Sequence, residues 1–394
     1  MAKTLALVNC HLITPLRLVK NGYVLIADGR IVDCGKGLPP SMDQSLDLQG
    51  CYLAPGFIDL HCHGGGGHDF MDGTVEAFVS GAQAHIPFGT TSLMPTTMAS
   101  TTEELHQVIG AYEQASTTNG LKPHFLGLHL EGPYFSLEKR GAQDPRHIRN
   151  PIPAEYQGIM ALTEGIKRWT FAPELPGALE MAGYLHSRGV LCSIGHSNAT
   201  YEEVLPAFEA GCTHITHLYS AMSTVRRDKS YRTAGVMESA YLIDEMTVEI
   251  IADGPHLPSS LLQLVYKIKG SDKICLITDA MRAAGQSTKE SILGSLEGGQ
   301  PVIIDDGVAK LPDGSSFAGS IATANRLVAN MVSLADVPLV EAVRMMTLTP
   351  ARIAGIDDGK GSIAPGKDAD LVAFNDELKI MLTIIGGQIC FARF

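Results

Sequence analysis

The sequence lacks several features that would define its class at once. No apolar run approaches the roughly 20 residues needed to span a bilayer, and the first residues, 1–5, do not open an apolar leader that ends in a small-residue cleavage site. Charged residues make up only 18%, and the net charge is −12, which argues against nucleic acid or an anionic membrane as the main partner. The eight cysteines form neither CxxC pairs nor a compact disulfide pattern. We therefore expect reduced thiols and a cytoplasmic protein.

What the 394 residues contain is an alternation of short apolar runs with helix-length amphipathic segments, which is typical of parallel βαβ units. Eight predicted strands with interleaved helices favour an α/β fold, a (β/α)8 TIM barrel. An open doubly wound sheet is the alternative, but no Gly-x-Gly-x-x-Gly motif follows the first strand. The predicted strands are residues 53–62, 90–95, 125–131, 169–173, 190–196, 213–217, 247–253 and 274–279, and the predicted helices are residues 75–87, 102–116, 153–166, 177–188, 200–210, 259–269, 321–335 and 339–347.

The two ends of the chain carry strand patterns without helix patterns. Residues 5–13 and 22–34 are strand-like, with an Asp28-Gly29 hairpin signal inside the second run. Residues 361–372 and 382–391 repeat short β patterns separated by turn residues. We expect residues 1–53 plus 350–394 to form a small β-sandwich domain beside a barrel of residues 54–349.

An apolar run, residues 55–60, leads directly into His61 and His63, which are followed by four glycines at 64–67. Successive strand side chains alternate between faces, so these two imidazoles share one side while Cys62 points to the other. Neutral imidazole nitrogens at that separation can bind one divalent metal ion such as zinc.

Polar residues also end four further predicted strands. Catalytic groups of a TIM barrel lie at the carboxyl ends of its strands, so these residues are expected to meet His61 and His63 at one mouth. An unpaired carboxylate at the end of an apolar strand would be costly, which favours a ligand role. The four additional candidate metal ligands are Glu131, His196, His217 and Asp279.

Other interpretations of these residues remain open. His196 could instead belong to the cap of the following helix, through its neighbours Ser197 and Asn198. His214 lies three positions before His217, should face the opposite side and is expected to be structural. His129 shares a face with Glu131, where it either supports the site or packs in the core.

Several motifs make the chain resemble the metal-dependent amidohydrolase superfamily and, within it, the N-acetylglucosamine-6-phosphate deacetylases. HxH after an apolar strand marks only the superfamily, whereas HLEGP and THLYxAM are far narrower. The matching segments are PGFIDLHCHG at 55–64, HLEGP at 129–133, GHS at 195–197, THLYSAM at 216–222, IADGPH at 251–256, TDA at 278–280, LTPAR at 348–352 and GSIAPGKDADL at 361–371.

This resemblance implies how the candidate ligands are shared. Glu131, His196 and His217 would hold one ion, and His61 and His63, with Glu131 bridging, a second. The one-metal and two-metal arrangements both occur in the family. Zinc is the expected metal, with iron, manganese or cobalt as alternatives.

The resemblance also implies hydrolysis of the acetamide of N-acetylglucosamine 6-phosphate to glucosamine 6-phosphate and acetate. A bound divalent ion lowers the pKa of water from about 16 toward about 7. Asp279 would accept the water proton and deliver it to the departing amine.

Substrate contacts follow from the same resemblance. The family usually has histidine at the position of Gln143 and asparagine at that of Ser220, so both positions depart from its pattern. The basic segment at residues 223–232 is the clearest cationic patch, and in family dimers its arginine serves the neighbouring subunit, which implies a homodimer. The implied contacts are Ala142, Gln143, Ser220, Ala221, Arg227 or Arg232, His256, Phe317, Ala318 and Gly319.

Two other functions are carried as alternatives. The two departures could adapt the site to another N-acetylated amino sugar or sugar phosphate. A non-catalytic sugar-phosphate sensor is the other alternative, although a sensor needs neither a water-activating metal nor Asp279.

Overall fold

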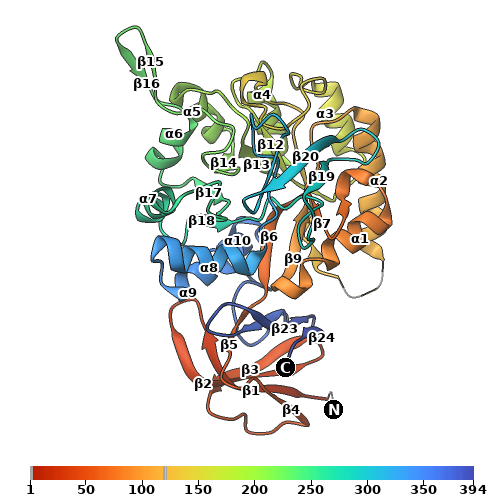
Figure 1. Cartoon of the computed structure of the whole chain (residues 1–394), viewed down its shortest axis with the longest axis vertical. Helices are drawn as coiled ribbons and strands as arrows, with labels where there is room; N and C mark the ends of the chain where they lie inside the picture. Colours follow the sequence, from red (N-terminus) through yellow and green to blue (C-terminus); the bar gives the residue numbers. More distant parts are fainter. Residues whose placement is uncertain (1–2, 119, 121) are drawn as a thin grey trace.

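The computed structural model describes residues 3–118, 120 and 122–394. Met1 and Ala2, the first two of the residues 1–5 discussed above, lie outside the described residues. Figure 1 shows a larger α/β unit above a smaller β unit that contains both chain termini. Within the described residues, no helix is both long and apolar enough to cross a membrane.

The larger unit is built on parallel strands that fall into a three-stranded sheet, β10-β9-β6, and a six-stranded sheet, β11-β12-β13-β14-β17-β18. Isolated parallel bridges, Thr96 with His129 and Cys62 with Ala280, connect the two sheets at both ends of the series. Each of the eight predicted strand ranges overlaps an observed strand, although β12 begins three residues and β14 one residue before the predicted start. The strands are β6 (Phe57–Cys62), β9 (Thr90–Pro95), β10 (His124–Phe125), β11 (Leu128–Glu131), β12 (Ile166–Phe171), β13 (Leu191–Ile194), β14 (Cys212–Ile215), β17 (Thr247–Ile250) and β18 (Ile274–Leu276).

Helices connect these strands and bury their apolar faces on them. Helix α2 begins in a capping box, since Glu104 N donates to Thr101 Oγ1 at 3.2 Å and Thr101 N donates to Glu104 Oε2 at 3.0 Å. The helices are α1 (Val75–Gln83), α2 (Thr102–Thr117), α3 (Pro153–Met160), α4 (Ala178–Ser187), α5 (Tyr201–Glu209), α6 (Val236–Leu242), α7 (Ser259–Lys269), α8 (Ala324–Ala335), α9 (Leu339–Arg344) and α10 (Leu348–Ile353), with 3₁₀ turns η1 (Phe70–Asp72), η2 (Ile86–Phe88) and η3 (Leu137–Lys139).

Some element predictions are wrong in detail. The helix predicted over residues 153–166 ends at Met160, and a turn in which Gly165 N donates to Thr163 Oγ1 at 2.8 Å leads into β12. Several short elements were not predicted: helices α6 and α10, the glycine-loop pair β7 (Gly64–Gly65) and β8 (His68–Asp69), the hairpin β15 (Arg226–Asp228) and β16 (Tyr231–Thr233), and a sheet of β19 (Glu290–Leu293), β20 (Gln300–Asp305) and β21 (Val308–Lys310).

The smaller unit is one eight-stranded sheet to which both ends of the chain contribute. Its order is β24-β23-β22-β5-β1-β2-β3, with β4 pairing to β1. Its strands enclose their own apolar core, which includes Leu7, Val24, Leu371 and Ile384. The strands are β1 (Leu5–Ile13), β2 (Leu18–Ala27), β3 (Arg30–Lys36), β4 (Gln44–Asp47), β5 (Tyr52–Pro55), β22 (Leu371–Phe374), β23 (Ile380–Ile385) and β24 (Gln388–Ala392).

Candidate metal centre and active site

The six residues selected as metal ligands lie together at the carboxyl ends of five parallel strands. All six are buried. Three of them, His196, His217 and Asp279, adopt left-handed backbone conformations, with φ of 49°, 29° and 48°. Non-glycine residues rarely adopt this region, and such strain is concentrated at functional sites.

One group of three ligand atoms forms around Glu131. Its Oε1 lies 3.0 Å from His217 Nε2 and 3.3 Å from His196 Nε2, and the two imidazole nitrogens are 3.2 Å apart. The three atoms therefore enclose a site of the size of one ion.

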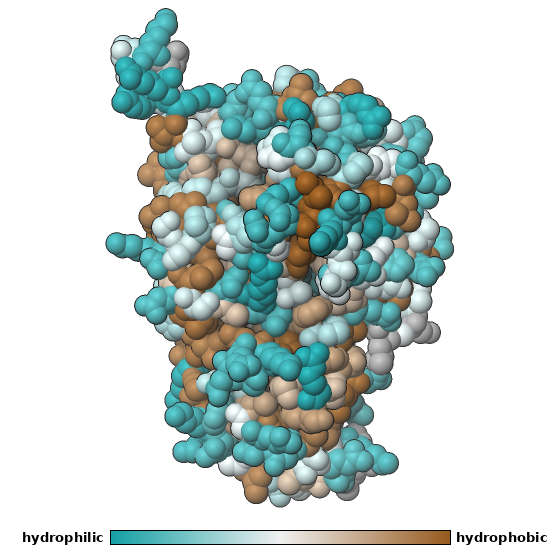
Figure 2. All heavy atoms as spheres, in the orientation of Figure 1, coloured by the Kyte–Doolittle hydropathy of each residue, from teal (hydrophilic) through white to brown (hydrophobic). Residues whose placement is uncertain are grey.

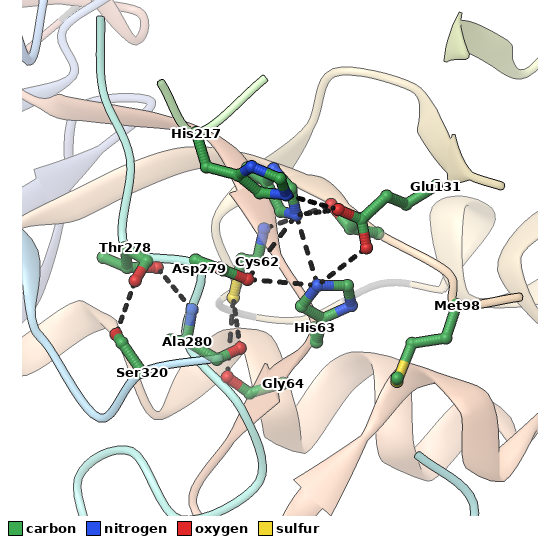
Figure 3. A network of polar contacts seen from close by, with 12 residues as sticks. Cys62, His63, Gly64, Met98, Glu131, His217, Thr278, Asp279, Ala280 and Ser320 are labelled. Atoms are coloured by element: carbon green, nitrogen blue, oxygen red, sulfur yellow. Dashed lines mark hydrogen bonds and ion pairs between the residues drawn. The ribbon is translucent and has the colours of Figure 1, made fainter. Parts of the chain in front are cut away.

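A second group contains His61, His63 and Asp279. Asp279 Oδ1 lies 3.2 Å from His63 Nε2 and 3.5 Å from His61 Nε2, and these two nitrogens are 3.2 Å apart. Figure 3 shows His63 between the carboxylates of Asp279 and Glu131. Glu131 reaches both groups, because its Oε2 is 3.5 Å from His63 Nε2 and its Oε1 is 3.5 Å from His61 Nε2.

The donor set fits one or two divalent ions. Nitrogen and oxygen ligands about 2.0–2.1 Å from a tetrahedral zinc stand roughly 3.3 Å apart, close to the separations within each group. All four imidazoles direct Nε2 toward the other ligands. In neutral imidazoles with Nε2 unprotonated, the lone pairs on these nitrogens would repel one another unless a cation or a proton lay between them. His196 donates from Nδ1 to Lys139 O at 2.9 Å, which leaves its Nε2 lone pair free.

The charges of the cluster compensate one another. Burial alone would raise the pKa of Glu131, but the charge of His61 and the hydrogen bonds from His196 and His217 lower it well below its usual range. Burial opposes the shift at Asp279 as well, yet the charge of His61 and the hydrogen bond from His63 lower the pKa of Asp279. Both carboxylates are therefore ionised at neutral pH and can act as ligands or as a base.

Gln143 is bound at both ends of its amide and belongs to this cluster. Its Oε1 accepts from Ala99 N at 2.9 Å, and its Nε2 donates to Glu131 Oε2 at 2.8 Å. The backbone donor fixes the amide orientation, so the NH₂ group faces the carboxylate and the cavity.

A cavity of about 840 Å³ opens above the cluster. It is lined by most of the residues selected for substrate binding, whereas Ala318 is buried without lining it and Arg227 and Arg232 lie elsewhere. Both arginines are exposed on the β15–β16 hairpin, which projects from the body as a hydrophilic arm in Figures 1 and 2. The selected residues that line the cavity are Ala142, Gln143, Ser220, Ala221, His256, Phe317 and Gly319, together with Glu131, His63, His196, His217 and Asp279.

Three cavity-lining cations were not selected from the sequence: Lys139, Arg140 and Lys310. The first two belong to the basic Lys-Arg-Gly segment that precedes Ala142, and this segment was their only signal. Lys310 had no signal, because it lies at the end of β21 in the unpredicted sheet.

His129, which the sequence left open, and His214, which was expected to be structural, both lie below the ligands. His129 is hydrogen-bonded through Nε2 to Thr170 Oγ1 at 2.7 Å and through Nδ1 to Thr96 Oγ1 at 3.2 Å. His214 is hydrogen-bonded through Nδ1 to Thr247 Oγ1 at 2.6 Å. Burial lowers the pKa of both histidines, so both are neutral. Neither belongs to the two three-ligand groups.

The sequence and the overall fold are similar to those of known hydrolases. The amidohydrolase family model matches residues 52–390, and the chain belongs to that family. The chain is 33% identical over 389 residues to the N-acetylglucosamine-6-phosphate deacetylase of Haemophilus influenzae, covering 97% of this chain and 98% of that protein. It is also 33% identical to an N-acetylgalactosamine-6-phosphate deacetylase of Escherichia coli O157:H7, covering 92% and 93%. Among solved structures, an aspartate-to-alanine variant of the Mycobacterium smegmatis N-acetylglucosamine-6-phosphate deacetylase in complex with N-acetylglucosamine 6-phosphate superposes with a TM-score of 0.90, at 29% identity and 99% coverage of both chains.

Proposed function

We propose that this protein hydrolyses the acetamide bond of N-acetylglucosamine 6-phosphate, releasing acetate and glucosamine 6-phosphate. The observation that carries this proposal is the pair of buried three-ligand groups joined by Glu131, which lies with Asp279 at the floor of a cavity wide enough for a sugar phosphate. Near full-length similarity to deacetylases with this activity supports the same substrate class.

Glu131, His196 and His217 would hold one divalent ion, and His61, His63 and Asp279 a second, with zinc as the first choice because of the nitrogen-rich donor set. When bound, such an ion would lower the pKa of a water molecule and polarise the acetamide carbonyl.

Asp279 is the general base and acid of the proposed reaction. Its carboxylate is ionised, lies at the cavity floor and is held by His63 at 3.2 Å. It accepts the proton of the attacking water and returns it to the amine as the C–N bond breaks. Gln143, with its NH₂ group toward the cavity, orients Glu131 beside the reacting carbonyl.

The cavity walls provide the sugar contacts. His256 donates Nδ1–H to Asp253 Oδ2 at 2.8 Å, which fixes the ring and leaves Nε2 for a sugar or phosphate oxygen. The Phe317 ring lies 4.6 Å from the His256 ring and covers the same wall. Ser220 and Ala221 line the wall beside His217.

We extend the proposal to the assembly and the architecture. The nine parallel strands, with β10 and β11 as two parts of one barrel strand, close as a (β/α)8 barrel over residues 54–349, and residues 1–53 plus 350–394 form the small β-sandwich domain. Arg227 or Arg232, carried on an arm away from its own cavity, reaches the phosphate in a partner's cavity of a cytoplasmic homodimer. The bridges Thr96–His129 and Cys62–Ala280 support closure.

A second candidate is the 4-epimer, N-acetylgalactosamine 6-phosphate. A relative named for that substrate has the same 33% identity, and Gln143 and Ser220 are the cavity positions that depart from the expected pattern.

The deciding experiment measures acetate release from both phosphorylated epimers and from their unphosphorylated forms, together with the metal content of the purified protein. The leading assignment predicts the highest kcat/KM on N-acetylglucosamine 6-phosphate. A preference for the galactose epimer supports the second candidate. Binding of the sugar phosphates without acetate release in metal-loaded protein would leave the sensor alternative.

A further inference from the structure

A buried ion pair lies directly beneath the candidate metal ligands. Arg168 of β12 and Glu249 of β17 have fully buried side chains, and both Arg168 terminal nitrogens bond the Glu249 carboxylate, one of them, NH2, at 2.9 Å. These strands are not neighbours in their sheet, so the pair crosses the interior that the strands enclose. Such interiors are normally filled by layers of bulky apolar side chains.

Arg168 has a partner in each direction in which it can donate. Its Nε donates to Ser193 Oγ at 2.9 Å, one terminal nitrogen donates to Leu60 O at 3.1 Å, and the other donates to Thr216 Oγ1 at 2.8 Å. Arg168 therefore holds Glu249 in one place relative to β6, β13 and β14, the strands that lead to the four candidate histidine ligands.

Glu249 in turn contacts two of the candidate metal ligands. Its Oε2 lies 3.4 Å from His61 Nδ1 and accepts from the backbone N of His217 at 3.4 Å. Its Oε1 is 3.4 Å from His214 Nε2, which lies farther from the cavity. A buried ion pair is weak evidence for stability, because desolvation of the charges offsets their attraction. The pair also contacts Nδ1 of His61, the ring nitrogen opposite the candidate ligand atom Nε2.

The two metal positions differ in how their histidines are supported. In the Glu131 group, His196 Nδ1 contacts a neutral acceptor, Lys139 O, at 2.9 Å. In the Asp279 group, His61 Nδ1 faces the Glu249 carboxylate. His63 Nδ1 and His217 Nδ1 have no hydrogen-bond partner within the part of the chain that the structure describes. A carboxylate acceptor fixes the Nδ1–H tautomer and increases the donor strength of Nε2 more than a carbonyl does.

We propose that Glu249, held and neutralised by Arg168, is a positioning residue for His61 that sets the metal affinity of the His61, His63 and Asp279 position. The pair holds the imidazole with Nε2 toward that position. Its contact with the Glu131, His196 and His217 position is to the backbone N of His217, at 3.4 Å, and not to a ligating ring, so that position depends on it less. This inference rests on the metal centre of the proposed function and specifies how its two positions differ.

The test is a zinc titration of chelator-treated protein, followed by isothermal titration calorimetry and by metal analysis after desalting. The wild-type protein should bind two ions. Glu249→Gln should retain one ion with unchanged affinity and bind the second about 10–100-fold more weakly. Two ions bound with wild-type affinities in this variant would overturn the inference, as would a wild-type protein that binds only one.

Glu249→Gln leaves the Arg168 charge buried without its counterion, so this variant can fail to fold. The double variant Arg168→Met/Glu249→Leu removes both charges at similar volume and carries the test in that case, because such replacements are commonly tolerated. It should show the same selective loss of affinity for the second ion. If the pair were merely structural, the double variant would change the melting temperature of the metal-free protein and leave both zinc affinities unchanged.

A matched control removes a carboxylate of another arginine pair. Arg149 Nε donates to Glu155 Oε1 at 2.9 Å, away from the ligand groups, so Glu155→Gln should bind both ions like wild type. The outcomes for the inference and for the proposed function remain separate. A wild-type protein that binds two ions but releases no acetate from any sugar would refute the proposed function, whereas the Glu249 comparison depends on the zinc affinities alone.

Discussion

Gln143 donates its side-chain amide to Glu131 Oε2 at 2.8 Å, while Oε1 of the same carboxylate faces His196 and His217. The two oxygens of Glu131 therefore have different surroundings. One is directed to the histidine pair, and the other is held between Gln143 and His63. This hydrogen bond fixes the plane of the carboxylate that joins the two candidate metal positions.

Replacing Gln143 with methionine keeps the side-chain length and removes the donor. Because outer hydrogen bonds to ligating groups typically contribute 10–100-fold to metal affinity or activity, we expect Gln143→Met to lower kcat/KM or zinc affinity by about that factor. Gln143→His supplies an imidazole donor at the same position and should retain more activity than Gln143→Met. The exposed Gln263→Met on α7 is the control. Equal activity of all three variants and wild type would remove Gln143 from the site.

Asp279→Asn tests the proton transfer. The asparagine keeps the shape of the side chain but cannot accept the water proton at neutral pH. We expect kcat to fall by at least about 10²–10⁴-fold, the usual contribution of a general base. The Glu131, His196 and His217 ion should remain, because Asp279 is not part of that group. Acetate release and metal analysis on the same preparation check both statements, and near-normal turnover would exclude Asp279 as the base.

The strands and the ligand cluster were predictable because they depend on local patterns. Residues 274–276 form β18 inside the predicted range 274–279, since a short buried apolar run that follows turn residues has few other outcomes. Polar residues at the ends of such runs pointed to His61, Glu131 and Asp279 for the same reason. Their convergence followed from one topological rule, that parallel strands present their carboxyl ends on one face.

The sheet over the cavity and the buried ion pair were not predictable in this way. The three strands β19–β21 are short and partly exposed, so their alternation is weak, although Asp306-Gly307, both at positive φ, is a recognisable hairpin signal. Glu249 and Arg168 stand out as charges inside apolar strands, but a sequence does not state which strands face each other across an interior. Arg168 and Glu249 are 81 residues apart, and the three-dimensional arrangement of the strands brings them together.

Asp370, at the junction of the two units, makes the stability of the protein depend on pH. It lies just before β22, its Oδ1 accepts from Gly386 N at 2.7 Å, and its Oδ2 is paired with Lys360. Burial raises the pKa of Asp370, but the hydrogen bond from His124 and the charge of Lys360 lower it below its ordinary value. A folded-state pKa below the unfolded value means that the carboxylate stabilises the protein above about pH 4 and that this contribution is lost as the pH falls.

Asp370→Asn should therefore lower the free energy of unfolding at pH 7 by about 1–3 kcal/mol, the range for a buried charged hydrogen-bonding group. The difference from wild type should shrink as the pH falls below about 4. Urea denaturation at pH 7, 4 and 3 measures it. The exposed Glu377→Gln, near the same strand, should change stability little at any pH. A constant difference between Asp370→Asn and wild type across this range would contradict the assignment.

Two of the three arginines on the β15–β16 arm lie side by side, because Arg227 and Arg232 are cross-strand partners. Arg227 Nε donates to Lys229 O at 2.6 Å and Arg232 NH1 donates to Ser230 O at 3.2 Å, both within the arm. Neither residue lines the cavity of its own chain. If the arm serves a partner's cavity, the arginine that contacts phosphate should affect KM for the phosphorylated sugar and leave metal content unchanged.

We expect Arg232→Ala to raise that KM by about 10–100-fold, the loss of one charge-assisted contact, and Arg227→Ala to have the smaller effect. A complementation experiment identifies the chain that supplies the arginine. Arg232→Ala and Asp279→Asn homodimers are each defective, but a mixed dimer whose arms cross contains one cavity with both defects and one cavity with neither. Mixing the two variants under conditions that exchange subunits should therefore restore activity toward half that of wild type per mixed dimer. If each arm served its own chain, one cavity of the mixed dimer would lack Arg232 and the other would lack Asp279. Neither cavity would then be intact, and mixing would restore no activity.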